Sequence, residues 1–114
     1  MRIRNVTRGS ELASRALAAD SFWLRLKGLL GRSSLAPGEA LLLEPCSSVH
    51  TAFMRFPIDV VYVDRSGLVK KVVSDLKPFR WSAVLRGGHS VVELPSGTAA
   101  ATDTVAGDQL TFES

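Results

Sequence analysis

The sequence predicts an α+β domain, built as a compact, strongly bent mixed β-sheet, barrel-like, of about seven short strands with one main α-helix. Three observations lead to this prediction. Short β-rich or apolar runs recur along the chain, single Gly and Pro residues fall where these runs would end, and one segment has the apolar spacing of a good helix. Because 114 residues suffice for one core, we expect residues 1–114 to form a single domain.

Two short strands are expected at the amino end, over residues 2–6 and 11–18. The second coincides with the Ala-rich stretch ELASRALAA, which could equally begin a helix. The main helix is expected in DSFWLRLKGLLGR, residues 20–32, where Asp20 or Ser21 can cap the amino end and Gly31 can end the helix. Its apolar side chains recur at the spacing of one helix face: Phe22, Leu26, Leu29 and Leu30.

The middle of the chain reads as β-structure. ALLLE, residues 40–44, is expected to be a buried strand, and IDVVYVDRSGLVKKVV, residues 58–73, a β-hairpin with its turn at 64–67. The first arm of the hairpin is continuously apolar, which predicts a central strand covered on both faces. Lys70 and Lys71 interrupt the second arm, which predicts an edge strand or a bulge there.

The carboxyl-terminal part is expected to hold a strand in SVVELP, a short helical turn in GTAAATDTVAGD and a last strand in QLTFE. Ser96 or Thr98 could cap the turn. Gly107 is expected to supply an unusual backbone angle, and Asp108 to accept amide hydrogen bonds before the last strand. The pair resembles the Gly-Asp turn, or "GD box", of cradle-loop barrels.

Composition restricts the classes of protein and of partner. One cysteine cannot form an intramolecular disulfide, and an unpaired thiol suits a reducing compartment. The amino end has no run of about 7–15 apolar residues, as a secretory signal would have, and no later run reaches the roughly 20 of a membrane span. A cytoplasmic location is therefore expected. The net charge is +3, but the basic residues are scattered, so a small molecule or a protein is a better partner than nucleic acid.

PCSSVHTAFMRFP, residues 45–57, places Cys46, His50 and Met54 four residues apart each. These spacings put the three side chains on one face of either a strand or a helix. Thiolate, imidazole and thioether suit Cu(I), whereas a closed zinc site wants four ligands. Cys46 and His50 could alternatively form a catalytic thiol pair. On an extended strand, however, residues four apart are roughly 13 Å distant, which favours a third interpretation, ordinary packing.

Two further features suggest ligand binding. Asp59 begins an apolar strand, where its carboxylate must cap a loop amide, pair with an arginine or serve a ligand. KPFRWSAVLRGGHS, residues 77–90, is a long loop in which arginine beside an aromatic ring could hold an anionic or sugar-like ligand; alternatively, Trp81 plugs one end of the barrel. We therefore expect a pocket near residues 46–59 and 77–90. Its candidate ligand-binding residues are His50, Asp59, Arg80, Trp81, Arg86 and His89.

Four landmarks follow one another in the chain: GLLGR, HTAFMRFPIDVVYVD, VVELPSGT and AGDQL. In this order they resemble the domain-of-unknown-function 192 family of small bacterial and archaeal proteins, over nearly the whole chain. Leu30 stands where that family usually has methionine, and Phe53-Met54-Arg55-Phe56 replaces its usual Trp-Met-Lys-Asn-Thr. The matching positions are Gly28, Leu29, Met54, Pro57, Asp59, Glu93, Gly97, Gly107 and Asp108. The resemblance implies a compact α+β, barrel-like domain without an established biochemical role, and it assigns none to Cys46 and His50.

The leading functional hypothesis is a non-enzymatic small-ligand-binding or accessory domain, because no complete catalytic motif is found in the sequence. A thiol enzyme that uses Cys46 and His50 is one alternative, and a soft-metal, copper-type binding protein with Cys46, His50 and Met54 as ligands is another. A protein-interaction module, with an exposed Trp23 or Trp81, is the remaining one.

Overall fold

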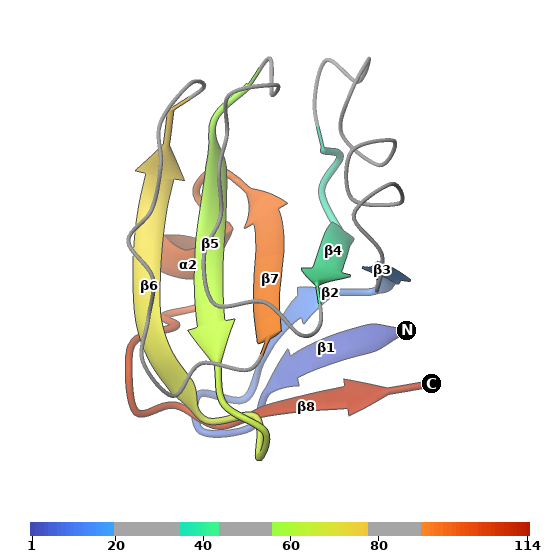
Figure 1. Ribbon diagram of the computed structural model, residues 1–114, viewed down its shortest axis with the longest axis vertical. Helices are drawn as coiled ribbons and strands as arrows, with labels where there is room; N and C mark the ends of the chain where they lie inside the picture. Colours follow the sequence, from blue (N-terminus) through green and yellow to red (C-terminus); the bar gives the residue numbers. More distant parts are fainter. Residues whose placement is uncertain (20–34, 44–55, 78–89) are drawn as a thin grey trace.

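The computed structural model describes residues 1–19, 35–43, 56–77 and 90–114 (Figure 1). This part of the chain is mostly β, with eight strands in two sheets and one short helix. The strands are β1 (Arg2–Asn5), β2 (Ser10–Ala13), β3 (Arg15–Ala19), β4 (Glu39–Leu43), β5 (Ile58–Val63), β6 (Val69–Leu76), β7 (Ser90–Pro95) and β8 (Leu110–Glu113), and the helix is α2 (Thr98–Ala101). The main helix predicted over residues 20–32 lies outside the described residues.

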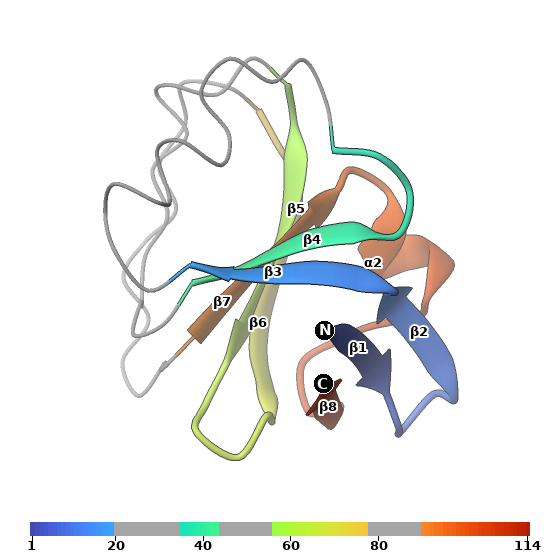
Figure 2. The same ribbon diagram turned by 90° about the vertical axis from the view of Figure 1, so that its right-hand side faces the viewer.

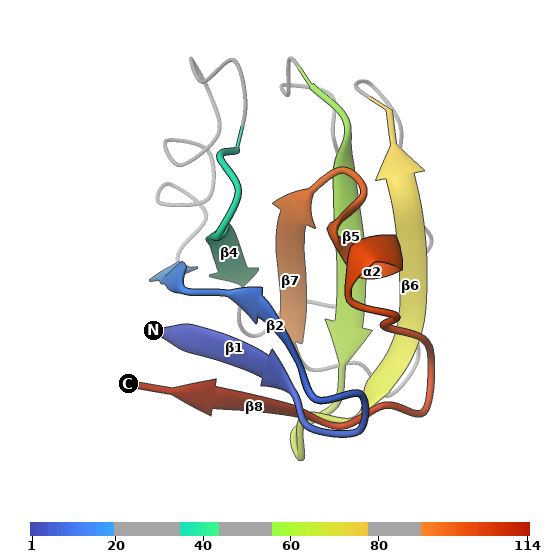
Figure 3. The same ribbon diagram turned by 180° about the vertical axis from the view of Figure 1, so that it is seen from behind.

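The strands form a three-stranded sheet in the order β2-β1-β8 and a five-stranded sheet in the order β3-β4-β7-β5-β6. The larger sheet is mixed, as predicted, because β3 and β4 are parallel and the other pairs antiparallel. Figure 2 shows β3 and β4 running across the middle of the view, with β1, β2 and β8 below them at the lower right. Figure 3 shows α2 over β5 and β6. The two chain ends lie near each other at β1 and β8.

One strongly bent, barrel-like sheet of an α+β domain was expected. The described part of the chain is instead mostly β, and its strands form two sheets. The strand predicted over residues 11–18 is broken at Ser14, so its halves β2 and β3 belong to different sheets. The break coincides with Gly38, whose carbonyl oxygen accepts the amides of both Ser14 and Arg15, at 3.0 and 2.9 Å. The described strands therefore form two sheets, and no closed barrel is found among them.

The predicted hairpin is confirmed. β5 pairs with β6 on one side and β7 on the other, and all its residues are buried, as its continuously apolar sequence indicated. β6 is an edge strand, and its pairing with β5 shifts register twice, as Lys70 and Lys71 suggested. Central and edge positions could thus be read from hydrophobicity alone.

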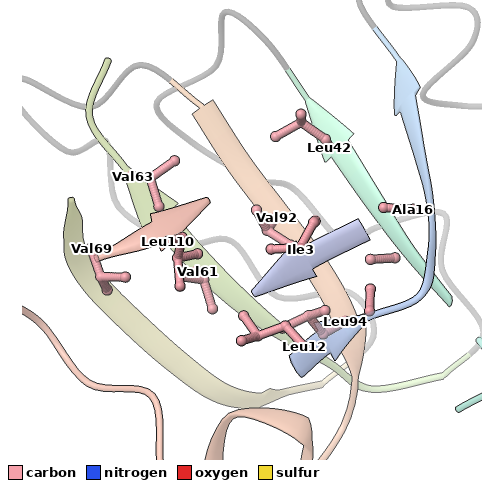
Figure 4. Close-up of a cluster of buried hydrophobic side chains, with 12 residues drawn as sticks. Ile3, Leu12, Ala16, Leu42, Val61, Val63, Val69, Val92, Leu94 and Leu110 are labelled. Carbon is pink, nitrogen blue, oxygen red and sulfur yellow. The ribbon is translucent and has the colours of Figure 1, made fainter. Parts of the chain in front are cut away.

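The five-stranded sheet has apolar side chains on both faces. One face packs against the three-stranded sheet around Val61, Val63 and Val92, which meet Ile3 and Leu110 (Figure 4). The opposite face carries a second buried cluster, which consists of Leu35, Leu41, Leu43, Phe56, Ile58, Val60, Tyr62 and Val91. Alternation along β5 assigns successive residues to the two clusters, as the period of a strand requires.

The two sheets are bonded together at one corner, where the hairpin turn at 64–67 meets the start of β8. The Leu110 amide donates to the Gly67 carbonyl at 2.9 Å, and Leu68 forms an isolated bridge with Gln109. Gly67 has a φ of 87°, and a Cβ there would lie 2.6 Å from the Leu110 carbonyl oxygen. Glycine is therefore required at this position for both conformation and space.

A buried polar network ties the first hairpin to the last turn. Asp108 is 2% exposed and accepts hydrogen bonds from the side chains of Asn5 (3.0 Å) and Arg8 (3.1 Å) and from the Val105 amide (3.1 Å). Burial alone raises the pKa of the Asp108 carboxyl, but these hydrogen bonds outweigh burial and hold its pKa below its ordinary value. Gly107 has a φ of 95°, so the predicted roles of Gly107 and Asp108 are confirmed.

We expect Gly67→Ala to destabilise the protein by about 2–4 kcal/mol, because a methyl group would enter the space of the Leu110 carbonyl in a left-handed backbone. Gly9→Ala is the matched control: Gly9 has a φ of 68°, and its Cβ would meet nothing within 4 Å. Gly9→Ala should lower the free energy of unfolding by only about 1 kcal/mol, the cost of placing a residue with a side chain in the left-handed conformation. Urea unfolding of both variants measures the difference, and equal losses would show that the corner yields to the methyl group.

Asp108 should make stability fall at acid pH. Folding lowers the pKa of Asp108, so its ionised carboxylate adds to the free energy of unfolding. This contribution is complete above the unfolded-state pKa of about 3.9 and is lost as pH falls toward the folded-state pKa. The free energy of unfolding of Asp108→Asn should be about 1.5–3 kcal/mol lower than that of wild type at neutral pH. It should also decrease less steeply as the pH is lowered.

The control for Asp108→Asn is Asp103→Asn. Asp103 is exposed and has a φ of 57°, a conformation that Asn adopts well. This variant makes the same charge change in the same loop and should stay near wild type. Chemical unfolding at a series of pH values checks both, and identical acid slopes for wild type and Asp108→Asn would contradict the assignment.

Candidate ligand-binding groove

A groove of about 580 Å³ opens between the two sheets, beside the hairpin turn. Its apolar lining comes from both sheets: Met1, Ala18, Leu42, Val63, Leu110 and Phe112. Its polar lining comes mostly from the turn and from β8: Asp64, Arg65, Ser66, Ser90, Gln109 and Thr111. Pockets for small ligands commonly have volumes of about 300–1,000 Å³, with apolar walls and a few polar groups.

The apolar part of the groove continues the core that lies between the sheets. Leu42, Val63 and Leu110 are nearly fully buried members of that core, and Phe112 packs against it partly exposed. β8 pairs with β1, and the isolated bridge of Leu68 with Gln109 joins the residues just before β6 and β8. An apolar ligand in the groove would therefore pack directly against the existing core. The protein would not have to expose further apolar side chains to bind it.

The hairpin turn forms a rigid rim of the groove. One carboxylate oxygen of Asp64 accepts the Ser66 amide (2.9 Å), the Ser66 hydroxyl (2.7 Å) and the Leu68 amide (3.0 Å). The Ser66 hydroxyl, followed by the Leu68 amide, holds the pKa of Asp64 below its ordinary value. The turn is thus closed by a carboxylate that stays ionised down to acid pH.

The rim is also bonded to the strand beside it. Gln109 donates from its side-chain amide to the Ser66 carbonyl at 2.6 Å and to the Leu110 carbonyl at 3.0 Å. Together with the bond from Leu110 to Gly67, these contacts fix the turn against β8. A preformed rim of this kind lowers the ordering cost of binding.

Arg65 lies at the tip of this turn and is exposed. Among the described residues no carboxylate lies within ion-pair distance of its guanidinium, although Asp64 is its neighbour in sequence. The second oxygen of Asp64 faces Lys70 instead, at 3.9 Å. The positive charge of Arg65 therefore remains available on the rim.

Most of the candidate residues predicted from the sequence lie outside the described residues. These are Cys46, His50, Met54, Arg80, Trp81, Arg86 and His89, whose predicted roles as metal ligands, catalytic pair or ligand contacts stay predictions. The pocket expected near residues 46–59 and 77–90 has only its borders in the described part. One border residue, Ser90, lines the groove between the sheets.

Asp59 lies at the start of β5, whereas the groove adjoins Val63 at the end of the same strand. It is fully buried, and its oxygens accept the amides of Asp75 (2.8 Å), Gly97 (3.1 Å) and Ala99 (2.8 Å). The expectation that Asp59 caps a loop amide is thus confirmed. It caps α2, where Ser96 or Thr98 was expected to do so; the Ser96 hydroxyl instead donates to Asp75 at 2.7 Å.

In residues 1–19, 35–43, 56–77 and 90–114, no three His, Cys, Asp or Glu side chains come close enough to hold a metal ion. Within the same ranges no helix has the length and hydropathy needed to cross a membrane.

Sequence reasoning missed the groove residues Arg65, Gln109 and Thr111. The sequence placed Arg65 correctly in a turn, but an Asp-Arg-Ser-Gly turn matches no binding motif. Gln109 directly precedes the last strand and Thr111 lies in it, more than 40 residues further along the chain. Only the pairing of Leu68 with Gln109 brings the turn and the strand together.

Comparison with solved structures supports the fold. A protein of unknown function from Novosphingobium aromaticivorans aligns with a TM-score of 0.81 and 18% identity, over 97% of this chain and 82% of that one. A putative transcription regulator from Sinorhizobium meliloti aligns with a TM-score of 0.77 and 20% identity, over 96% and 89%. At these identities the likeness concerns the fold alone.

Sequence relatives carry the comparison further. The UPF0127 protein PF1050 of Pyrococcus furiosus is 34% identical over 114 aligned residues, which cover 93% of each chain. A UPF0127 protein of Thermococcus sibiricus is 29% identical, over 96% of this chain and 73% of the relative. The family model for domain of unknown function 192, described as "Uncharacterized ACR, COG1430", matches residues 4–112. The chain therefore belongs to the domain-of-unknown-function 192 family, as its sequence landmarks indicated.

Proposed function

We propose that this protein is a non-enzymatic domain that binds a small, partly apolar ligand in the groove between its two sheets. One observation carries the proposal: a groove of about 580 Å³ whose walls continue the core and whose polar rim is held in place by hydrogen bonds. A ligand there would gain free energy by burying apolar surface, at about 25 cal/mol for each Å². The polar rim would orient its head.

The chemistry of the rim favours binding over catalysis. The Ser66 hydroxyl donates to Asp64, which could resemble a nucleophile beside its base. That carboxylate also accepts two amides, however, and its pKa is lowered, whereas a general base works best with a pKa near the operating pH. The hydrogen bonds of Asp64 close the turn and leave it a poor base.

β3 offers a matched pair of substitutions to test this proposal. Ala18 is exposed and lines the groove, whereas its neighbour Leu17 is 64% exposed and points to the other face of the strand. Ala18→Trp should fill the mouth of the groove and weaken binding of an apolar ligand at least about tenfold, the effect of about 1.4 kcal/mol. Leu17→Trp places the same side chain outside the groove and should bind as wild type.

Titration with Nile red, a neutral apolar dye that fluoresces on burial, measures both variants. Saturable one-to-one binding by wild type and by Leu17→Trp, but not by Ala18→Trp, is expected. Amide shifts in residues 63–67 and 109–112 should accompany the titration. No saturable binding by wild type, or equal binding by both variants, would refute the proposal.

A further inference from the structure

The charged groups at the groove do not cancel. Asp64 and Arg65 are the two charged side chains in the lining. Asp64 has three hydrogen-bond donors on one oxygen, and Lys70 lies 3.9 Å from the other oxygen, so its negative charge is already compensated. Arg65 has no carboxylate partner among the described residues. The turn therefore presents an uncompensated positive charge to the groove. The amino-terminal ammonium of Met1, which also lines the groove, donates to the Ala16 carbonyl oxygen at 3.3 Å.

The other polar side chains of the rim offer few free hydrogen-bond donors to the head of a ligand. The Ser66 hydroxyl and the side-chain amide nitrogen of Gln109 are occupied as donors within the rim. The Thr111 side chain has no hydrogen bond among the described residues and can donate or accept. A guanidinium, by contrast, has five donors arranged to hold a carboxylate by two parallel hydrogen bonds.

We propose that the groove takes a single amphiphilic molecule with an anionic head of the carboxylate class and a short apolar chain. The inference rests on the function proposed above and adds the class of ligand. The head lies against Arg65 at the tip of the turn, and the chain lies along Leu42, Val63, Leu110 and Phe112. Because the groove is bounded by both sheets, the ligand is a free monomer rather than a lipid in a membrane surface.

Three probes of equal chain length test the class of ligand: octanoate, octanol and octylammonium, each used below its micelle concentration. Octanoate should bind wild type about two- to fivefold more tightly than octanol, the range expected for an ion pair at an exposed site, and octylammonium should bind more weakly than both. The preference for octanoate should decrease as salt is added, because exposed charges are screened. Isothermal titration and amide shifts at residues 63–67 measure these affinities.

Two variants of Arg65 and one control assign the preference to its charge. Arg65→Gln should make octanoate and octanol bind equally, without weakening octanol, and Arg65→Lys should keep part of the preference. Arg4→Gln makes the same change of charge at an exposed residue of β1 outside the groove lining and should change nothing. Arg65 and Arg4 are both exposed, so folding should be preserved in all three variants, and thermal unfolding checks it.

The outcomes separate the two proposals. Equal binding of octanoate and octanol to wild type overturns the ligand class and leaves the groove as a binding site. An octanoate preference that survives in Arg65→Gln overturns the placement of the head against Arg65. Failure of all three probes and of Nile red overturns both. Binding to anionic vesicles without binding of free octanoate would also overturn the inference, in favour of a membrane surface.

Discussion

The arrangement of the two sheets depends on the corner where the hairpin turn meets the start of the last strand. There the Leu110 amide donates to Gly67, while the Val69 amide donates to Asp108 and the Gly107 amide to Val69, at 2.8–2.9 Å. These bonds connect the edge strand of one sheet to the edge strand of the other. A side chain at Gly67 would separate them, since its Cβ would lie 2.6 Å from a carbonyl oxygen. The position of the groove follows from this contact.

Three aspartates with similar chemistry organise the loops around this frame. Asp59 caps the short helix, Asp64 closes the hairpin turn, and Asp108 joins the first and last turns. Each uses its carboxylate to satisfy main-chain amides, which would otherwise be costly to leave unpaired. Asp64 and Asp108 also pair with Lys70 and Arg8, at 3.9 and 3.1 Å, and none of the three aspartates pairs with Arg65. The charge of the groove is thus a consequence of how its loops are closed.

The candidate site was much harder to predict than the elements that form it. The sequence drew attention to Cys46 and His50, because rare residue types at regular spacing stand out, and these residues lie outside the described ranges. The groove is built from ordinary residues such as Val63, Gln109 and Phe112, which carry no motif. Their chemistry arises from being neighbours, and no local pattern records that the turn at 64–67 lies against residues 109–112.

The sequence by itself determined the local structure: the hairpin and its turn, the buried central strand, the last strands, and the roles of Gly107 and Asp108. These features follow from hydrophobic alternation and from backbone preferences that act over a few residues. Only the tertiary structure decided that the chain breaks at Ser14 and divides its strands between two sheets. It also decided that Asp59 caps a helix some 40 residues away. Such pairings are set by contacts distant in sequence, because whether two strand edges or a carboxylate and an amide meet depends on how the whole chain packs.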